Sequence, residues 1–118
     1  LYDKGYKVFI QLMEINNVDE AGYLSLFEWK HKEILESLYF ADSYGVLHPS
    51  EIEHYYNKLA MIGFEKISFH AHNTIAMALP NSLKAIECGV WSVDVTQNGI
   101  GRNGGNLDSA ELFEHLAH

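Results

Sequence analysis

Apolar residues gather in four short runs along the chain, and each run is followed by a segment with helical spacing. The first run, residues 7–13, is almost continuously apolar, which is typical of a strand buried on both faces of a parallel sheet. Three later runs predict strands over residues 37–41, 66–72 and 92–96. The strands therefore start about 30 residues apart.

The segments between these strands predict helices, and proline and glycine mark their ends. Pro49 suits the first position of the second helix, and Gly63 suits its stop. Gly89 closes the third helix, whereas Pro80 interrupts its apolar stripe, so this helix either begins near Pro80 or is kinked there. A last helix is expected over residues 110–116.

The first helix has the least regular pattern of the four. We expect it over residues 20–33, with core contacts from Tyr23, Leu26, Phe27 and Trp29. Asn16, Asn17 and Asp19 lie just before it and offer a helix cap.

The order βαβαβαβα implies a parallel sheet with right-handed crossovers. Two architectures fit this order. One is a four-stranded flavodoxin-like sheet, and the other is half of a (β/α)8 barrel. In both, ligands bind beyond the carboxyl ends of the strands.

Every polar cluster of this chain lies at such a strand end. The clusters are Gln11 and Glu14; Asp42 and Ser43; His70, His72 and Asn73; and Asp94 and Thr96 with the glycine-rich loop that follows. His70 and His72 are two residues apart on a strand, so their side chains should share one face. Two neighbouring imidazoles can share a divalent metal, although two histidines stacked at a strand end without metal fit the same pattern.

Composition narrows the class of protein. The 118 residues fit one domain or a piece of a larger one, and the 47% of hydrophobic residues suffices for a packed core. A formal net charge of −8 argues against binding nucleic acid by charge. Cys88 is the single cysteine, which suits a reducing compartment. No apolar run is long enough to span a membrane, so we expect a cytoplasmic protein.

The start of the sequence predicts a fragment. Leu1 stands where an initiator methionine would, and residues 1–6 look like the end of a helix.

Three motifs together resemble the DRE-TIM metallolyase superfamily, and most closely its 4-hydroxy-2-oxovalerate aldolase-like members. They are ADSYG at residues 41–45, HAHNT at residues 70–74 and GIGRNGGNL at residues 99–107. Their order and spacing are similar to those of the family. The resemblance implies a TIM barrel, of which residues 1–118 would form the C-terminal half, strands five to eight, within the catalytic domain.

The same resemblance assigns roles to individual residues. It makes His70, His72 and Asn106 ligands of a divalent metal, Mn²⁺ or Mg²⁺. Asp42 and Ser43 would face the substrate, and the loop 99–105 would close over the active site. The implied reaction is aldol cleavage of a small-molecule 2-oxo acid through a metal-stabilised enolate.

Some features depart from the family pattern. The Asp-Arg-Glu tripeptide of strand one does not occur in this sequence, so we expect the 118-residue chain to be inactive alone. Two alternatives to the aldolase function remain. One is a Claisen-type acyl transferase of the isopropylmalate or homocitrate synthase kind, and the other is a non-catalytic half-barrel module. A half-barrel leaves two sheet edges unpaired and an apolar inner face uncovered, so we also expect a homo-oligomer.

Several residues keep a structural interpretation beside the functional one. Asp42 orients a substrate or ligand histidine, or caps the loop before the next helix. Asn106 binds the metal or forms a turn, and the glycine-rich loop is a mobile lid or a tight turn. Asp94 is expected to make a structural hydrogen bond, and Arg102 to be solvated. The remaining histidines are expected at the surface without a role: His31, His48, His54, His115 and His118.

Overall fold

The computed structural model describes residues 1–117, so His118 lies outside the described part. The strands are β1 (Val8–Leu12), β2 (Leu35–Ala41), β3 (Ile67–His70) and β4 (Ser92–Val93). The helices are α1 (Glu20–Glu28), α2 (Pro49–Ile62), α3 (Ala78–Cys88) and α4 (Ser109–Leu116). Short 3₁₀ turns are η1 (Tyr2–Lys4), η2 (Ile15–Asn17), η3 (Lys32–Ile34) and η4 (Gln97–Gly99). None of the described helices is both long and apolar enough to cross a membrane.

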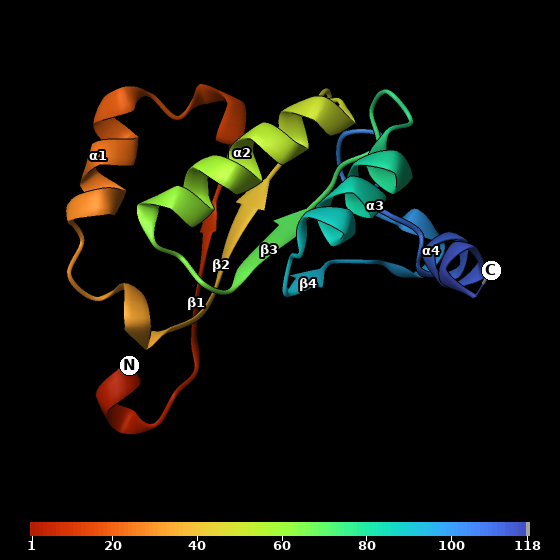
Figure 1. Ribbon diagram of the computed structural model, residues 1–118. Coiled ribbons are helices and arrows are strands. Elements are labelled where there is room, and N and C mark those ends of the chain that lie inside the picture. The colour runs from red at the N-terminus through yellow and green to blue at the C-terminus, as the bar shows by residue number, and fades with distance from the viewer. Residues whose placement is uncertain (118) are drawn as a thin grey trace.

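The four strands form one parallel sheet in the order β1-β2-β3-β4, the same as along the chain. Each crossover thus adds the next strand on the same side, as in a barrel, whereas a flavodoxin-like sheet reverses its strand order. Figure 1 shows the consequence, with α1 at the β1 side of the sheet and α4 at the β4 side. The predicted half-barrel arrangement is confirmed.

The hydrophobic core lies between the helices and one face of the sheet. Phe40 and Phe69 are neighbours in the register of β2 and β3, are fully buried, and have ring centroids 4.9 Å apart. Ile52 and Leu59 of α2 are also fully buried in this cluster. Burying such side chains contributes roughly 1.5–3 kcal/mol each to folding.

The helices that the structure describes leave the opposite face of the sheet uncovered. Phe9 of β1 is 47% exposed and Gln11 is exposed, so the prediction that this strand is buried on both faces is wrong. Its near-continuous apolar run does not distinguish a strand with two covered faces from one with a single covered face, because the covering elements lie elsewhere in the chain.

A chain of hydroxyl groups crosses this open face, so the expectation of an apolar inner face is wrong in this part. Ser37 Oγ donates to the Lys66 carbonyl (3.0 Å) and lies 2.7 Å from Ser68 Oγ. Ser92 Oγ donates to Ser68 Oγ (2.9 Å), and Tyr39 Oη lies 3.1 Å from Ser92 Oγ. Ser37 and Ser68 are buried although they face away from the helices.

The first helix is shorter than predicted, because α1 ends at Glu28 rather than near residue 33. Lys32 Nζ turns back and donates to the carbonyls of Leu26, Phe27 and Trp29 at the helix end (3.2, 2.6 and 2.9 Å). A cation at the carbonyls of the last helical turn stabilises the stop. Phe27 is 60% exposed, so its predicted core contact is wrong.

Proline and glycine act at the helix ends as predicted. Pro49 is the first residue of α2, and Gly63 ends that helix with a φ of 114°. Pro80 lies in the first turn of α3, where a backbone N–H has no partner to lose, so that helix begins near Pro80 and is not kinked there. Asn73 Oδ1 accepts from the Ala78 N–H (3.0 Å) at the start of α3.

Candidate active site

His70 and His72 stand at the carboxyl end of β3 with their imidazole rings side by side. The ring centroids are 4.9 Å apart at an interplanar angle of 74°. Ala71 between them is 2% exposed and belongs to the core on the other face. The shared face predicted for the two histidines is confirmed, while metal binding by them stays a prediction.

Each imidazole is held through its Nδ1 atom by an acceptor in the residue that follows a neighbouring strand. His70 Nδ1 lies 2.8 Å from Asp94 Oδ2, and His72 Nδ1 lies 3.0 Å from the Asp42 carbonyl oxygen. Carboxylate and carbonyl oxygens accept, so Nδ1 donates in both cases. The Nε2 lone pairs of both rings are then free to bind a cation, which is how protein frameworks commonly orient metal-binding histidines.

Asn106 lies directly opposite His72, with which it forms an isolated antiparallel bridge. Asn73 N–H donates to the Gly105 carbonyl (2.9 Å) and fixes this pairing. The Asn106 amide nitrogen donates to the Ile100 carbonyl (3.2 Å), whereas its Oδ1 is buried without a hydrogen-bond partner among the described residues. A buried carbonyl oxygen without a partner costs about 1–3 kcal/mol, so a ligand that uses it is favoured.

The chemistry of these donors fits a divalent cation in part. Two free imidazole nitrogens and one amide oxygen suit Mn²⁺, but hard cations of this type prefer about six ligands, largely oxygen. Within residues 1–117, no cluster of three or more His, Cys, Asp and Glu side chains could hold a metal. The residues described here therefore supply part of a ligand shell.

Asp42 is fully buried, and its carboxylate is engaged by the loop that follows β2. Oδ1 accepts from the Val46 N–H (3.1 Å), and Oδ2 accepts from the Leu47 N–H (3.1 Å). This is the capping role foreseen as one alternative, and the Asp42 backbone carbonyl in addition orients His72. Substrate contact by Asp42 stays a prediction, and in this arrangement its carboxylate faces the loop.

Ser43 lies at the end of β2 beside the end of β1. Its Oγ accepts from the Glu14 N–H (2.7 Å), and its carbonyl accepts from Asn103 Nδ2 (2.5 Å). Among the described residues, no hydrogen bond uses the Ser43 hydroxyl proton. The hydroxyl is therefore free to donate to a substrate oxygen, as the predicted substrate role requires.

The glycine-rich loop is folded onto the loop between β3 and α3. Thr74 Oγ1 lies within hydrogen-bonding distance of the Tyr44 carbonyl (2.6 Å) and the Asn103 carbonyl (2.5 Å). Gly104 has a φ of +80°, and a Cβ there would lie 2.7 Å from Thr74 Cα. The loop thus forms a closed turn, and this close approach requires glycine.

The sequence model of the HMGL-like family matches residues 10–118. The chain belongs to the HMGL-like family. It lies within the DRE-TIM metallolyase superfamily, as its motifs indicate.

Two curated relatives of this HMGL-like chain carry different activities in their names. A probable 2-isopropylmalate synthase of Methanosarcina acetivorans is 32% identical over 115 residues, which is 98% of this chain and 22% of the relative. The 4-hydroxy-2-oxovalerate aldolase of Carboxydothermus hydrogenoformans is 33% identical over 82 residues, which is 70% of this chain and 24% of the relative. The chain thus spans about a quarter of each, and identity does not separate the two activities.

A solved structure supports the barrel fold of the HMGL-like chain. The HMG-CoA lyase of Bacillus subtilis superposes with a TM-score of 0.76 at 20% identity, over 98% of this chain and 43% of the lyase. This likeness concerns the fold. The four βα units described here correspond to part of a TIM barrel.

Sequence reasoning missed the contacts that join the three loops of the HMGL-like site. Thr74, Asn103 and the hydroxyl of Tyr44 received no role. Asn103 has a positive φ of 50°, which asparagine tolerates better than most residues, but the sequence does not specify which loop it contacts. Asp94 was expected to make a structural hydrogen bond, and the structure identifies His70 as its partner.

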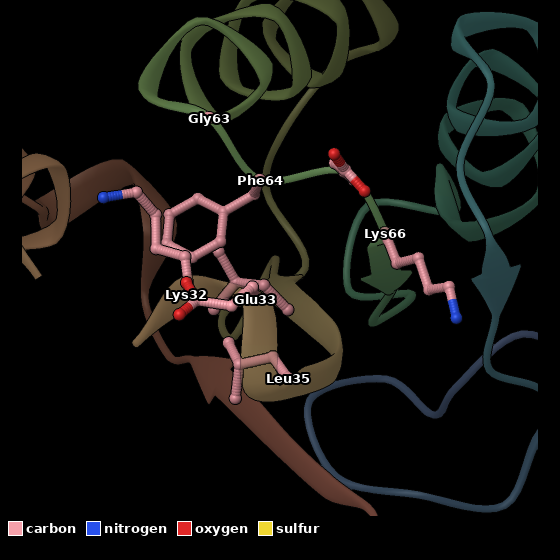
Figure 2. Close-up of a pocket in the computed structure, with 8 residues that line it drawn as sticks. Lys32, Glu33, Leu35, Gly63, Phe64 and Lys66 are labelled. Carbon is pink, nitrogen blue, oxygen red and sulfur yellow. The ribbon is translucent and has the colours of Figure 1, made fainter. Parts of the chain in front are cut away.

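A pocket of about 380 Å³ lies away from this site, at the amino ends of β2 and β3. Figure 2 shows Lys32 beside the ring of Phe64 there, with Lys66 at the other side. The Lys32 ammonium group already donates to three carbonyls at the carboxyl end of α1, so it has a structural role. The pocket lacks the histidines and the family motifs, and we do not assign it to the reaction.

Proposed function

We propose that the protein that contains this chain is a metal-dependent carbon–carbon lyase of the 4-hydroxy-2-oxovalerate aldolase type, with a 2-oxo acid as substrate. The observation that carries the proposal is the His70–His72 pair, whose Nε2 atoms are left free by the hydrogen bonds at Nδ1. Asn106 is bridged to His72 through the backbone, and its Oδ1 has no hydrogen-bond partner among the described residues. Family members are divalent-metal-dependent enzymes, which supports the same assignment.

Bound at this pair, Mn²⁺ or Mg²⁺ would supply Lewis-acid chemistry that polarises the carbonyl of a 2-oxo acid. The residues of this chain prepare that site. Asp94 and the Asp42 carbonyl hold the two imidazoles in one orientation, and Ser43 offers a hydroxyl proton to a substrate oxygen. The closed glycine-rich loop places Asn106 opposite His72.

A Claisen-type acyl transferase is the second candidate, because the isopropylmalate synthase relative matches nearly all of this chain at a similar identity. Both reactions use a carbonyl polarised at the same place. The difference lies in the co-substrate, since only the transferase consumes an acyl-CoA.

Assays of the purified full-length protein with Mn²⁺ distinguish these functions. We expect cleavage of a 4-hydroxy-2-oxo acid into a 2-oxo acid and an aldehyde without any acyl-CoA, and no such activity from the 118-residue chain alone. Condensation that depends on acyl-CoA, with no cleavage, would identify the transferase. A full-length protein with neither activity would favour a non-catalytic half-barrel module.

Asp94 should matter for metal affinity because it fixes the His70 ring. We expect Asp94→Ala in the full-length protein to weaken Mn²⁺ binding by roughly 10- to 100-fold in calorimetric titration, the usual effect of removing the partner of a metal-binding histidine. Asp3→Ala, at an exposed carboxylate near the start of the chain, is the matched control. Equal affinity in both variants would show that Asp94 does not position His70.

We also propose that the 118-residue chain on its own forms a homo-oligomer. β1 and β4 each leave one edge without a strand partner in the described sheet, and Phe9 and Trp91 are exposed beside the open face (47% and 48%). Edges and apolar side chains of this kind favour association. The net charge of −8 supports neither a nucleic-acid partner nor an anionic membrane surface.

A further inference from the structure

Glu14 adopts a backbone conformation that glutamate rarely takes. Its φ and ψ are 50° and 53°, in the left-handed region, just past the carboxyl end of β1. Such a conformation persists only where the surroundings hold it. Here the Glu14 N–H donates to Ser43 Oγ (2.7 Å), and the Asn17 N–H donates to the Glu14 carbonyl (2.7 Å).

The Glu14 side chain is oriented by a neighbour from the loop after β2. Tyr44 donates its phenolic hydrogen to Glu14 Oε1. The pKa of Tyr44 is raised above its ordinary value by this hydrogen bond and by the charge of Glu14, so the phenol keeps its proton and remains a donor. Tyr44 is 45% exposed and Glu14 is half-buried, so the pair lies at the rim of the site.

The histidines, Ser43 and Glu14 follow the carboxyl ends of three neighbouring strands, so Ser43 lies between the histidines and Glu14. His70 ends β3, Ser43 follows β2, and Glu14 follows β1, at similar levels in the register of the sheet. Neighbouring strands are about 4.8 Å apart, so the end of β1 lies roughly 10 Å from the end of β3. A substrate whose 2-oxo acid group lies at the histidines and whose chain crosses Ser43 therefore directs its far end toward Glu14.

The chemistry of Glu14 determines what that far end can carry. A carboxylate has about four acceptor positions, and Tyr44 is the only side chain that donates to it among the described residues. The positions that remain accept hydrogen bonds from a hydroxyl group. They repel a second carboxylate, and they gain nothing from a methyl group.

We propose that Glu14, positioned by Tyr44, binds the end of the substrate remote from the 2-oxo acid group and selects a tail that ends in a hydroxyl group. This inference rests on the proposed aldolase function and specifies its substrate class. Ser43 links the two ends, because the backbone of Glu14 orients the hydroxyl that is free to contact the middle of the substrate.

The test compares three 4-hydroxy-2-oxo acids of equal chain length that end in a hydroxyl, a methyl or a carboxylate group. For the full-length protein we expect kcat/KM to be highest for the hydroxyl-ended acid, by at least about tenfold. In Glu14→Gln we expect the preference for hydroxyl over carboxylate to fall by about 10- to 100-fold, because the charge is lost. Tyr44→Phe should reduce the same preference by a smaller factor.

A second variant separates specificity from folding. Glu14→Gly suits the left-handed conformation and removes the side chain, so a folded protein is expected. It should lose the preference for hydroxyl over methyl, whereas Glu28→Gln, at an exposed carboxylate of α1, should keep both preferences.

The outcomes that overturn the inference differ from those that overturn the proposed function. A parent protein that cleaves all three acids equally well, or Glu14 variants that lose activity equally on all three, would refute a selective role of Glu14 while leaving the aldolase function intact. A parent protein that cleaves none of them would refute the proposed function and this inference together.

Discussion

Replacing His70 or His72 with alanine is expected to weaken Mn²⁺ binding by the full-length protein by more than about 100-fold. Each change removes a free Nε2 atom from a pair that the structure orients from two neighbouring strands. Loss of a ligand should exceed the roughly 10- to 100-fold loss that follows removal of a ligand's hydrogen-bond partner. Calorimetric titration with Mn²⁺ measures the effect directly and does not depend on a known substrate.

His115→Ala is the matched control, because His115 is exposed on α4 and does not belong to the site. We expect this variant to bind Mn²⁺ as the parent does. Parent-like affinity in both His70→Ala and His72→Ala would show that the metal, if bound, uses other residues, and would remove the basis of the proposed function.

Gly104→Ala is expected to open the contact between the glycine-rich loop and the loop after β3. A methyl group at this position would lie 2.7 Å from Thr74 Cα and 2.8 Å from the Thr74 backbone nitrogen, and the φ of +80° is itself unfavourable for alanine. We expect a loss of about 1–3 kcal/mol in the free energy of unfolding. Because Asn106 follows two residues later, Mn²⁺ affinity should fall as well.

Gly5→Ala offers a control with the same backbone problem and no steric one. Gly5 has a φ of +86°, and a Cβ there would have no neighbouring heavy atom within 4 Å. Urea unfolding and Mn²⁺ titration of the two variants in the full-length protein separate the effects. Equal losses of stability with unchanged metal affinity would mean that the Thr74 contact does not hold Asn106 in place.

Much of the fold follows from local signals. Pro49 and Gly63 delimit α2 because the restrictions of proline and the freedom of glycine act within one turn of the chain. The end of α1 could not be predicted, because it depends on Lys32 reaching back over six residues to the Leu26 carbonyl. Likewise, the exposure of Phe9 depends on where the helices pack, and its own run of sequence does not contain that information.

In the candidate site, too, some features follow from local sequence and others depend on contacts between distant segments. Strand alternation alone places His70 and His72 on one face. The hydrogen bond between His70 and Asp94 depends on the register of β3 against β4, and that between Asn103 and Ser43 joins loops 60 residues apart. Such contacts follow from the completed sheet, which explains why sequence reasoning found the ligands more readily than the groups that hold them.

The hydrogen bonds that link the hydroxyl groups on the open face all run in one donor-to-acceptor direction. The Ser37 hydroxyl donates its hydrogen to the Lys66 carbonyl, so it accepts from the Ser68 hydroxyl. The Ser68 hydroxyl, whose hydrogen is used in this way, accepts from the Ser92 hydroxyl. Ser92 has then used its proton, which leaves Tyr39 as the donor at the head of the chain. The phenol of Tyr39 therefore presents only lone pairs to whatever approaches it across this face, and a side chain or water that binds there must bring its own hydrogen.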